Sequence, residues 1–267
     1  MFDILNRLYL YLVFIINDLI EVYKDPLCIN EYNIFSSQSN INLYNYNQSI
    51  PKILHQTHET NLQKRENYIA SQMLVNMNPE YEFKFYTSTQ RRAYIKNNFN
   101  EYILKAYDKI NHGTTKSDLF RYCVLYIEGG IYIDCKSSPV EPFRNFLSDN
   151  VSFQVFYDID CERLSTGFIA CEPENKIILN CINQCVKNVF NDNYGINPLD
   201  PTGPSLLTTC SKSFKVGILG KLDYNTQYFY SNSNRPLIKR IYSNYISIFD
   251  IPKRHEYYWI MGKLFVK

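Results

Sequence analysis

Hydrophobic residues follow two different periods along the chain from residue 50 onward. Short runs such as "IPKILHQT" (50–57) and "EFKFYT" (82–87) have the composition of strands, whereas longer segments repeat apolar residues every three to four positions, as helices do. The predicted strands cover residues 50–57, 82–87, 131–134, 151–157 and 167–171, and the predicted helices cover 61–77, 90–110, 115–128 and 173–190. Strands separated by helices predict an α/β fold with a largely parallel sheet.

The helix predicted over residues 115–128 is apolar on nearly every side, so we expect it to be buried. Thr115 as N-cap and Asp118 three residues later fit a capping box, and a pair of glycines ends the helix. Asp118 and Arg121 lie on adjacent turns of one flank. Because burying charged groups is costly without partners, the two side chains either open onto a polar cleft or bind each other tightly.

Asp134 lies where the next predicted strand ends, and Lys136 follows two residues later. Ligands of open α/β sheets bind outside the carboxyl ends of strands, which makes Asp134 a candidate site residue. Asp158 and Asp160 also have D-x-D spacing, but no buried helix and glycine pair precede them. We interpret them as a loop pair, with an acceptor-side or substitute metal role as the alternative.

The chain before residue 50 differs from the rest. The apolar run Leu8 to Ile16 is well short of the roughly 20 residues that span a bilayer, and it predicts a packed or interfacial helix. Peripheral membrane contact through residues 1–20 is the alternative. A polar, aperiodic linker follows. We therefore expect an N-terminal helix and linker over residues 1–49 and one domain over residues 50–267.

Composition narrows the classes of function. A net charge of +2 gives no reason to expect nucleic-acid binding, and we interpret most short basic pairs, such as Arg91-Arg92, as solvated surface. The eight cysteines lack a metal-ligand spacing, apart from Cys181 and Cys185 on one helix face, so buried free thiols are favoured. We expect a cytoplasmic or membrane-peripheral protein, and two Asn-x-Ser sequons keep a lumenal location open.

Four segments in fixed order carry a resemblance to a known family. These are "IPKILHQTHE", "KSDLFRYCVLYIEGGIYIDCK", "TGFIACEPEN" and "PTGPSLLT". Together they resemble glycosyltransferase family 32, the group of α-1,6-mannosyltransferase-like and capsular polysaccharide synthesis proteins, which shares a sugar-binding region with glucosylating bacterial toxins. The resemblance implies a GT-A fold with a Rossmann-like mixed sheet flanked by helices. It also implies transfer of a hexose from a UDP- or GDP-sugar to a glycan, protein or other hydroxyl acceptor, with retention of configuration.

The resemblance also implies roles for individual residues. Asp118 and Arg121 would contact the donor sugar, and Asp134 would be the first acid of the family's D-x-D motif. The remaining implied substrate contacts are His55 and Gln56 in the first strand, Lys136, Thr202 and Gly203 at a helix start, and Trp259 near the end. His255 in the closing "KRHEYYW" segment is a candidate metal ligand beside Asp134.

Each of these candidates has an alternative. Thr202 and Gly203 begin a helix whose free N–H groups favour a phosphate or sugar hydroxyl, but an ordinary turn has the same pattern. His55 and His58 are three residues apart, and packing or capping explains them better than a metal pair.

Lys136 departs from the family pattern, because the second acid of the motif normally ligates Mn2+ or Mg2+ and a lysine cannot. Three alternatives follow: a transferase in which the ammonium neutralises the diphosphate, a metal held by Asp134 with other residues, or an inactive nucleotide-sugar or glycan-binding relative.

Overall fold

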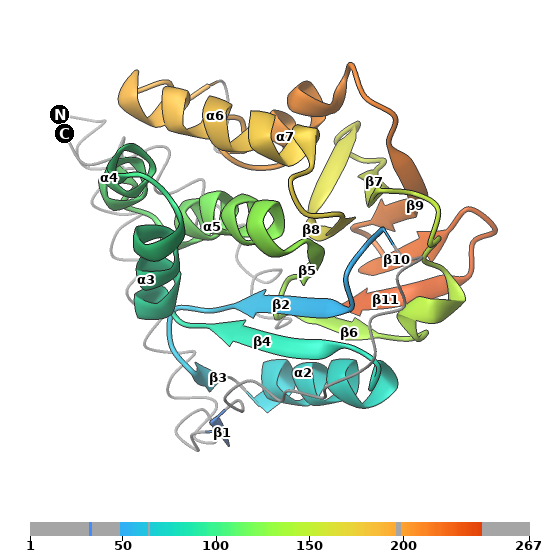
Figure 1. Ribbon diagram of the computed structural model, residues 1–267. Helices are drawn as coiled ribbons and strands as arrows, with labels where there is room; N and C mark the ends of the chain where they lie inside the picture. Colours follow the sequence, from blue (N-terminus) through green and yellow to red (C-terminus); the bar gives the residue numbers. More distant parts are fainter. Residues whose placement is uncertain (1–31, 34–48, 64, 196–198, 242–267) are drawn as a thin grey trace, which may run out of the picture.

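The computed structural model describes residues 32–33, 49–63, 65–195 and 199–241. A nine-stranded sheet in the order β4-β2-β5-β8-β7-β9-β10-β11-β6 organises the fold, with helices on both of its faces (Figure 1). Its strands are β2 Ile53–Thr57, β4 Glu82–Tyr86, β5 Gly130–Ile133, β6 Ser137–Pro139, β7 Phe153–Asp158, β8 Arg163–Cys171, β9 Gly217–Asp223, β10 Tyr228–Ser231 and β11 Pro236–Arg240. The expected α/β class is confirmed.

The sheet is mixed rather than largely parallel. Strand β2 is parallel to both β4 and β5, but β8 runs antiparallel between β5 and β7, and β9, β10 and β11 form an antiparallel meander that ends on β6. The meander was not predicted from sequence. Strand β9 explains why, since only two of its seven residues are buried and its apolar pattern is correspondingly weak.

The helices follow the sequence pattern with shifted ends. They are α2 Arg65–Met77, α3 Ser88–Asn98, α4 Glu101–Lys109, α5 Gly113–Glu128, α6 Lys176–Phe190 and α7 Pro204–Ser211, with a short 3-10 turn at Phe143–Asn145. The first helix starts late because β3 (Leu62–Gln63) pairs with β1 (Tyr32–Asn33). Residues 90–110 form two helices, since the Asn100 side chain accepts a hydrogen bond from the Ile103 N–H and starts α4.

Helix α5 corrects one prediction. It begins at Gly113 with His112 at the N-cap position, so Thr115 is not the N-cap and Asp118 belongs to no capping box. Gly129 ends the helix at φ 64°, a left-handed conformation that favours glycine.

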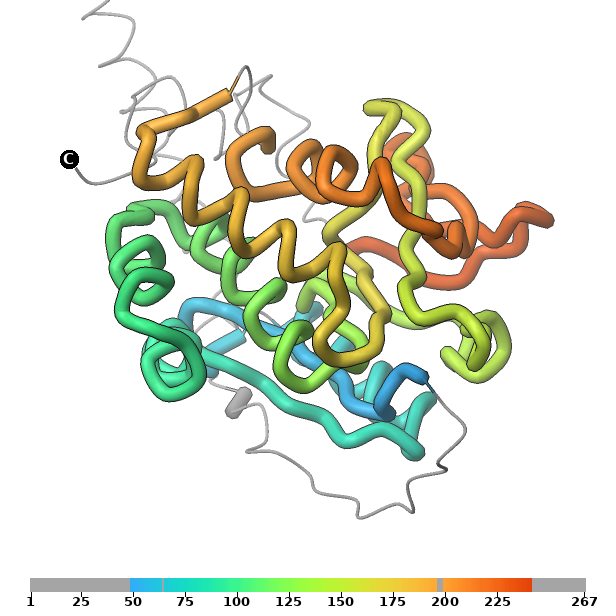
Figure 2. Tube along the Cα trace, turned by 45° about the horizontal axis from the view of Figure 1, so that its top comes forward, coloured from blue at the N-terminus to red at the C-terminus, as the bar shows by residue number. Residues whose placement is uncertain are grey.

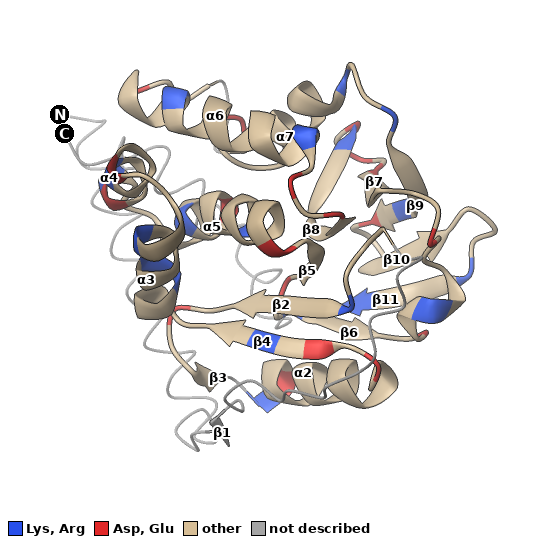
Figure 3. Ribbon diagram, viewed as in Figure 1, with Lys and Arg blue, Asp and Glu red and all other residues tan. Residues whose placement is uncertain are grey.

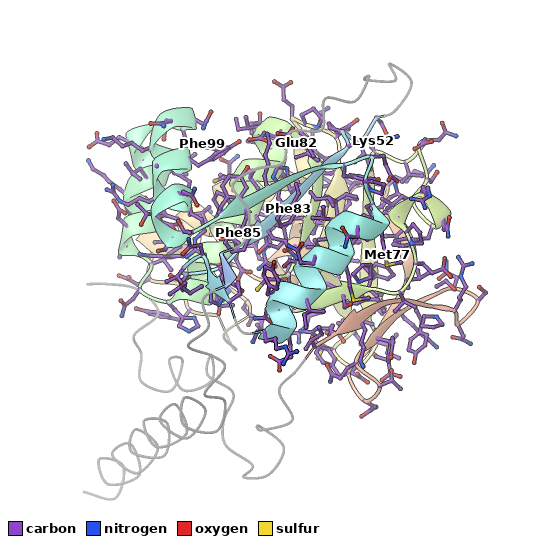
Figure 4. The ribbon with its side chains drawn as sticks, turned by 90° about the horizontal axis from the view of Figure 1, so that it is seen from below. Lys52, Met77, Glu82, Phe83, Phe85 and Phe99 are labelled. Carbon is purple, nitrogen blue, oxygen red and sulfur yellow. The ribbon has the colours of Figure 1, made fainter. Side chains whose placement is uncertain are left out.

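Two hydrophobic cores lie on the two faces of the sheet. Helix α2 covers one face, where Phe83 and Phe85 of β4 pack with Leu74 (Figure 4). Helices α3 to α7 lie over the other face (Figures 1 and 2). Strand β5 is buried on both sides, because Ile131 faces the first core and Tyr132 the second. Because β5 is packed on both faces, the residue that follows it is held at a fixed place on the edge of the sheet.

No helix in the described part of the chain is long and apolar enough to cross a bilayer. The helix expected within residues 1–20 and the candidates His255 and Trp259 lie outside the described residues.

Candidate active site

Asp134 directly follows β5 at the edge where β2 and β4 also end. Its backbone N–H donates a hydrogen bond to the Gly167 carbonyl at 3.0 Å, which fixes the residue against β8. Its side chain is 35% exposed, and Oδ1 lies 3.6 Å from Nη2 of Arg121. A Cβ at position 167 would lie 3.1 Å from Asp134 Oδ2, so the glycine leaves room for the carboxylate. Asp134 therefore presents a partly exposed carboxylate beside a buried cation.

Arg121 is held by groups from three parts of the chain. Its Nη1 donates to the Thr166 carbonyl at 2.6 Å, and its Nη2 lies 3.1 Å from Asp118 Oδ1. The guanidinium also stacks over the Tyr132 ring at 4.6 Å from the centroid. Of the two sequence alternatives for the pair, the structure has the tight one, with both side chains less than 10% exposed. The planar fork suits this arrangement, because it can serve two carboxylates and a carbonyl at once.

Thr202 and Gly203 lie against the same pair, although they are 84 and 85 residues away from Asp118. The Thr202 hydroxyl donates to Asp118 Oδ2 at 2.9 Å. The Thr202 carbonyl accepts from the Tyr122 hydroxyl at 2.8 Å, so both ends of the residue are tied to α5. A Cβ on Gly203 would lie 3.3 Å from Asp118 Oδ2. Gly203 is the N-cap position of α7, which confirms the predicted helix start.

The charges of this cluster influence one another. Figure 3 shows charged segments of both signs on α5, whose flank faces β8. Burial raises the pKa of Asp118, and the Asp134 carboxylate acts in the same direction, whereas Arg121 and the Thr202 hydroxyl lower it. The carboxylate of Asp118 is therefore stable in its charged form only while Arg121 and Thr202 stay in place.

His55 and Gln56 are fully buried in β2. The His55 Nε2 donates to the Gly129 carbonyl at 3.0 Å, and Nδ1 lies 3.4 Å from the Tyr86 hydroxyl. Gln56 accepts from the Ser71 hydroxyl at 2.8 Å, and its Nε2 lies 3.5 Å from the Asp134 carbonyl. Both side chains thus bind protein groups behind the strand end, where they support the backbone that carries Asp134.

The burial of His55 predicts a pH dependence of stability. Removal of the ring from water lowers its pKa from 6.5 to about 4, although the Glu128 carboxylate and the Gly129 carbonyl oppose the shift. The unfolded chain takes up the proton first, so the contribution of His55 is present above pH 6.5 and is lost as the pH falls towards 4. The loss should total roughly 3 kcal/mol.

Chemical unfolding of wild type and His55→Gln between pH 7.5 and 4.5 measures this contribution. The variant keeps a polar side chain but cannot take up the proton, so its free energy of unfolding should fall less steeply with acidification. Parallel pH profiles for the two proteins would contradict the assignment.

Lys136 is exposed, and its carbonyl accepts a hydrogen bond from the Ile241 N–H at 2.6 Å. Among the residues that the structure describes, no three His, Cys, Asp or Glu side chains are arranged to hold a metal ion. Asp118, whose carboxylate also contacts Arg121, is committed to that residue and to Thr202. The described side chains around Asp134 therefore do not by themselves fit a divalent cation, which needs several oxygen ligands.

Asp158 and Asp160 lie at the end of β7 and in the turn that follows. Asp158 Oδ1 accepts from the Cys161 N–H at 3.2 Å, and its Oδ2 is 3.6 Å from Arg163 Nε. Asp160 accepts from the Tyr224 N–H at 3.2 Å. Both carboxylates thus bind groups of the β7–β8 turn and the meander. Asp160 lies in a turn, as the loop interpretation predicts, but Asp158 is a buried residue of strand β7, so that interpretation is wrong for Asp158.

Arg91 is the residue that the sequence interpretation missed. It has no exposed surface and donates to Thr57 and Ser117, whereas its neighbour Arg92 is 51% exposed and paired with Asp108. The prediction of solvated surface is therefore right for Arg92 and wrong for Arg91. The only sequence signal is helical phase, because Arg91 lies four residues before the buried Ile95 and shares its face.

Comparison with known proteins identifies this region. Residues 63–153, which contain Asp118, Arg121 and Asp134, match the family described as "Glycosyltransferase sugar-binding region containing DXD motif". Residues 63–153 thus resemble a glycosyltransferase sugar-binding region. The resemblance drawn from the sequence is thereby confirmed, and the strand end with Asp134 lies inside the matched region. At the expected position of the motif, residues 134–136 of this chain read Asp-Cys-Lys.

Named relatives of this glycosyltransferase region are mannosyltransferases. Inositol phosphoceramide mannosyltransferase 3 of Schizosaccharomyces pombe is 31% identical over 106 residues, which cover 40% of this chain and 27% of that protein. Mannosyl phosphorylinositol ceramide synthase SUR1 of Saccharomyces cerevisiae is 25% identical over 178 residues, covering 63% of this chain and 43% of that protein. The chain thus matches less than half the length of these curated relatives.

A solved structure supports the fold. The "PaToxG Glycosyltransferase" superimposes with a TM-score of 0.54 and 22% identity, over 62% of this chain and 70% of that one. The mixed sheet with helices on both faces agrees with the GT-A architecture that the family resemblance implied.

Proposed function

We propose that the protein transfers a hexose from a UDP- or GDP-linked donor to a hydroxyl group of a glycan or other acceptor, with retention of configuration. The observation that carries the proposal is the position of Asp134. Its carboxylate is partly exposed at the sheet edge beside Arg121, within the matched glycosyltransferase region. The names of the relatives make mannose the first sugar to test.

The described residues suggest a division of labour. Arg121 and Asp118 are rigidly held, and together they would orient hydroxyl groups of the donor sugar with little reorganisation. Thr202 and Gly203 would close the cluster from the side of α7. No side chain is assigned as a catalytic base, because retaining transfer in many proposals needs no dedicated nucleophile. The main task of the protein would be to stabilise the diphosphate leaving group.

Glycosyltransferases with a D-x-D motif generally use a divalent cation, but the described side chains do not complete a site for one. We propose that the ammonium of Lys136 neutralises part of the diphosphate charge instead. Its exposure, two residues after Asp134, supports this role. The candidate metal ligand His255 lies outside the described residues.

Donor hydrolysis and transfer across a panel of UDP- and GDP-sugars, with Mn2+ or with EDTA, test this proposal. Wild-type turnover should persist in EDTA. Lys136→Asp restores the acid pair, and its activity should depend strictly on Mn2+, because two carboxylates repel a diphosphate unless a cation intervenes.

Two other outcomes have distinct meanings. If EDTA abolishes wild-type turnover and Mn2+ restores it, the lysine does not replace the cation. If nucleotide binding is intact but no sugar donor turns over under either condition, the protein is a binding protein that has lost the chemistry. The observation that favours this second function is Lys136, a lysine where the family motif has its second acid.

A further inference from the structure

The buried Arg91 joins four separate elements of the fold. Its Nη1 donates to the Thr57 hydroxyl at 2.9 Å and to the Ser117 hydroxyl at 3.1 Å, and its Nε donates to the Tyr107 hydroxyl at 3.2 Å. Its Nη2 forms an ion pair with Glu59. A guanidinium without exposed surface is tolerated only when its N–H groups find partners. Here Nε, Nη1 and Nη2 each have at least one, and Nη1 alone joins Thr57 of β2 to Ser117 of α5.

Two of these contacts end at the candidate active site. Thr57 is the last residue of β2, and the preceding Gln56 lies against the Asp134 carbonyl. Ser117 immediately precedes Asp118, and the Ser117 carbonyl is 3.4 Å from Nε of Arg121. Arg91 therefore fixes the distance between the end of β2 and the turn of α5 that carries the charged pair, without touching the exposed face of either.

The contact with Glu59 fastens the turn after β2. The carboxylate of Glu59 packs against the first residue of α5, where a Cβ on Gly113 would lie 2.5 Å from Oε1, so a larger residue there would displace the Glu59 side chain. Helix α5 has no side-chain cap, and a carboxylate at its N-terminus is favoured by the helix dipole. The turn over residues 57–59 is thus held by the contacts of Arg91 with Thr57 and Glu59, and by the contact of Glu59 with the start of α5.

The turn also lies within electrostatic reach of the strand end. Burial lowers the pKa of His58, and the positive charges of Lys136 and Arg91 act in the same direction. Residues 57–59 therefore lie close enough to Lys136, the residue proposed to neutralise the diphosphate, for His58 and Lys136 to interact electrostatically.

We infer that Arg91 is a positioning residue for the donor site, which holds the turn 57–59 and α5 in the arrangement that binds a nucleoside diphosphate. The inference rests on the proposed function. It assigns Arg91 no contact with the donor. Its effect should therefore fall on donor affinity, through the position of the turn, more than on the rate of the bound complex.

The test measures GDP and UDP binding by calorimetry, together with KM and kcat for the best donor, in Arg91→Met and Glu59→Gln. Arg91→Met should weaken binding of the preferred nucleotide and raise KM by about tenfold or more, since small displacements in a positioned site are costly. The change in kcat should be smaller. Glu59→Gln should produce a weaker effect in the same direction, and Arg91→Lys, which keeps the charge, should recover part of the affinity.

Two controls separate positioning from general packing. Arg92→Met removes the exposed neighbour on the same helix and should leave nucleotide binding unchanged. Tyr107→Phe removes one partner of Arg91 but leaves the contacts with Thr57, Glu59 and Ser117, so it should affect thermal unfolding more than affinity.

Three results would overturn the inference. If folded Arg91→Met binds the nucleotide with wild-type affinity, the inference is wrong. If that variant does not fold, wild-type affinity in both Glu59→Gln and Arg91→Lys excludes it equally. If the wild-type protein binds neither GDP nor UDP, the proposed function itself fails, and the role of Arg91 in it fails as well.

Discussion

Asp134→Asn should lower donor turnover by about a hundredfold or more while leaving the fold intact. The substitution keeps the shape of the side chain and removes the negative charge 3.6 Å from Arg121. Because a third of the side chain is exposed, its ion pair should contribute no more than ~1 kcal/mol to stability. Steady-state turnover of the preferred nucleotide sugar and thermal unfolding of the same preparations measure the two effects.

Asp160→Asn is the matched control for this prediction. It changes an aspartate on the same edge of the sheet, and its carboxylate binds only the Tyr224 N–H among the contacts described. Its turnover should stay close to that of the wild type. Normal turnover in Asp134→Asn would remove Asp134 from the reacting centre, and a large loss in the control would favour the pair Asp158 and Asp160 instead.

Arg121→Ala should destabilise the fold by about 3–5 kcal/mol and abolish measurable donor binding. The substitution leaves Asp118 buried without its counter-charge and the Thr166 carbonyl without its donor. Chemical unfolding gives the loss of stability, and calorimetry with the preferred nucleotide gives the loss of binding.

The pH dependence of this variant provides a second measurement. Burial already raises the pKa of Asp118, and loss of Arg121 should raise it further. The folded pKa of Asp118 then lies further above that of the unfolded chain than in wild type, so protonation stabilises the folded variant more, and its deficit against wild type should shrink as the pH falls.

Arg92→Ala is the matched control for this second prediction. It breaks an ion pair that is 51% and 40% exposed on its two sides, so its cost should be small beside that of Arg121→Ala. Similar unfolding free energies for Arg121→Ala and Arg92→Ala would show that the pair of Asp118 and Arg121 does not contribute as a buried ion pair. Unchanged nucleotide affinity in Arg121→Ala would exclude the donor-contact role.

Much of the candidate site could be predicted because its signals are local. The apolar pattern of α5, the glycine pair and the strand that ends at Asp134 all lie within residues 113–134. Helical and strand periods are short-range properties, so a single stretch of sequence contains them. The pairing of Asp118 with Arg121 is likewise local, since residues three apart on a helix are neighbours.

The contacts that hold the site together are not local. Thr202 reaches Asp118 across 84 residues of sequence, and Arg121 reaches the Thr166 carbonyl across 45. The sequence indicated Thr202 as a helix start, but it did not indicate which helix it would contact. The antiparallel meander of β9 to β11 was missed for a similar reason, because partly exposed strands owe their stability to neighbours more than to their own composition.

Arg91 is an example of what the sequence determined and what only the tertiary structure decided. The sequence determined that this residue lies in a helix after the second parallel strand, and that Asp134 lies at a strand end. In the sequence, Arg91 differs from Arg92 only in helical phase, because adjacent residues of one type differ only in the direction in which they leave the helix. Burial of Arg91 depends on Thr57, Tyr107 and Ser117, which meet only when four elements pack together, and periodicity along the chain does not encode that meeting.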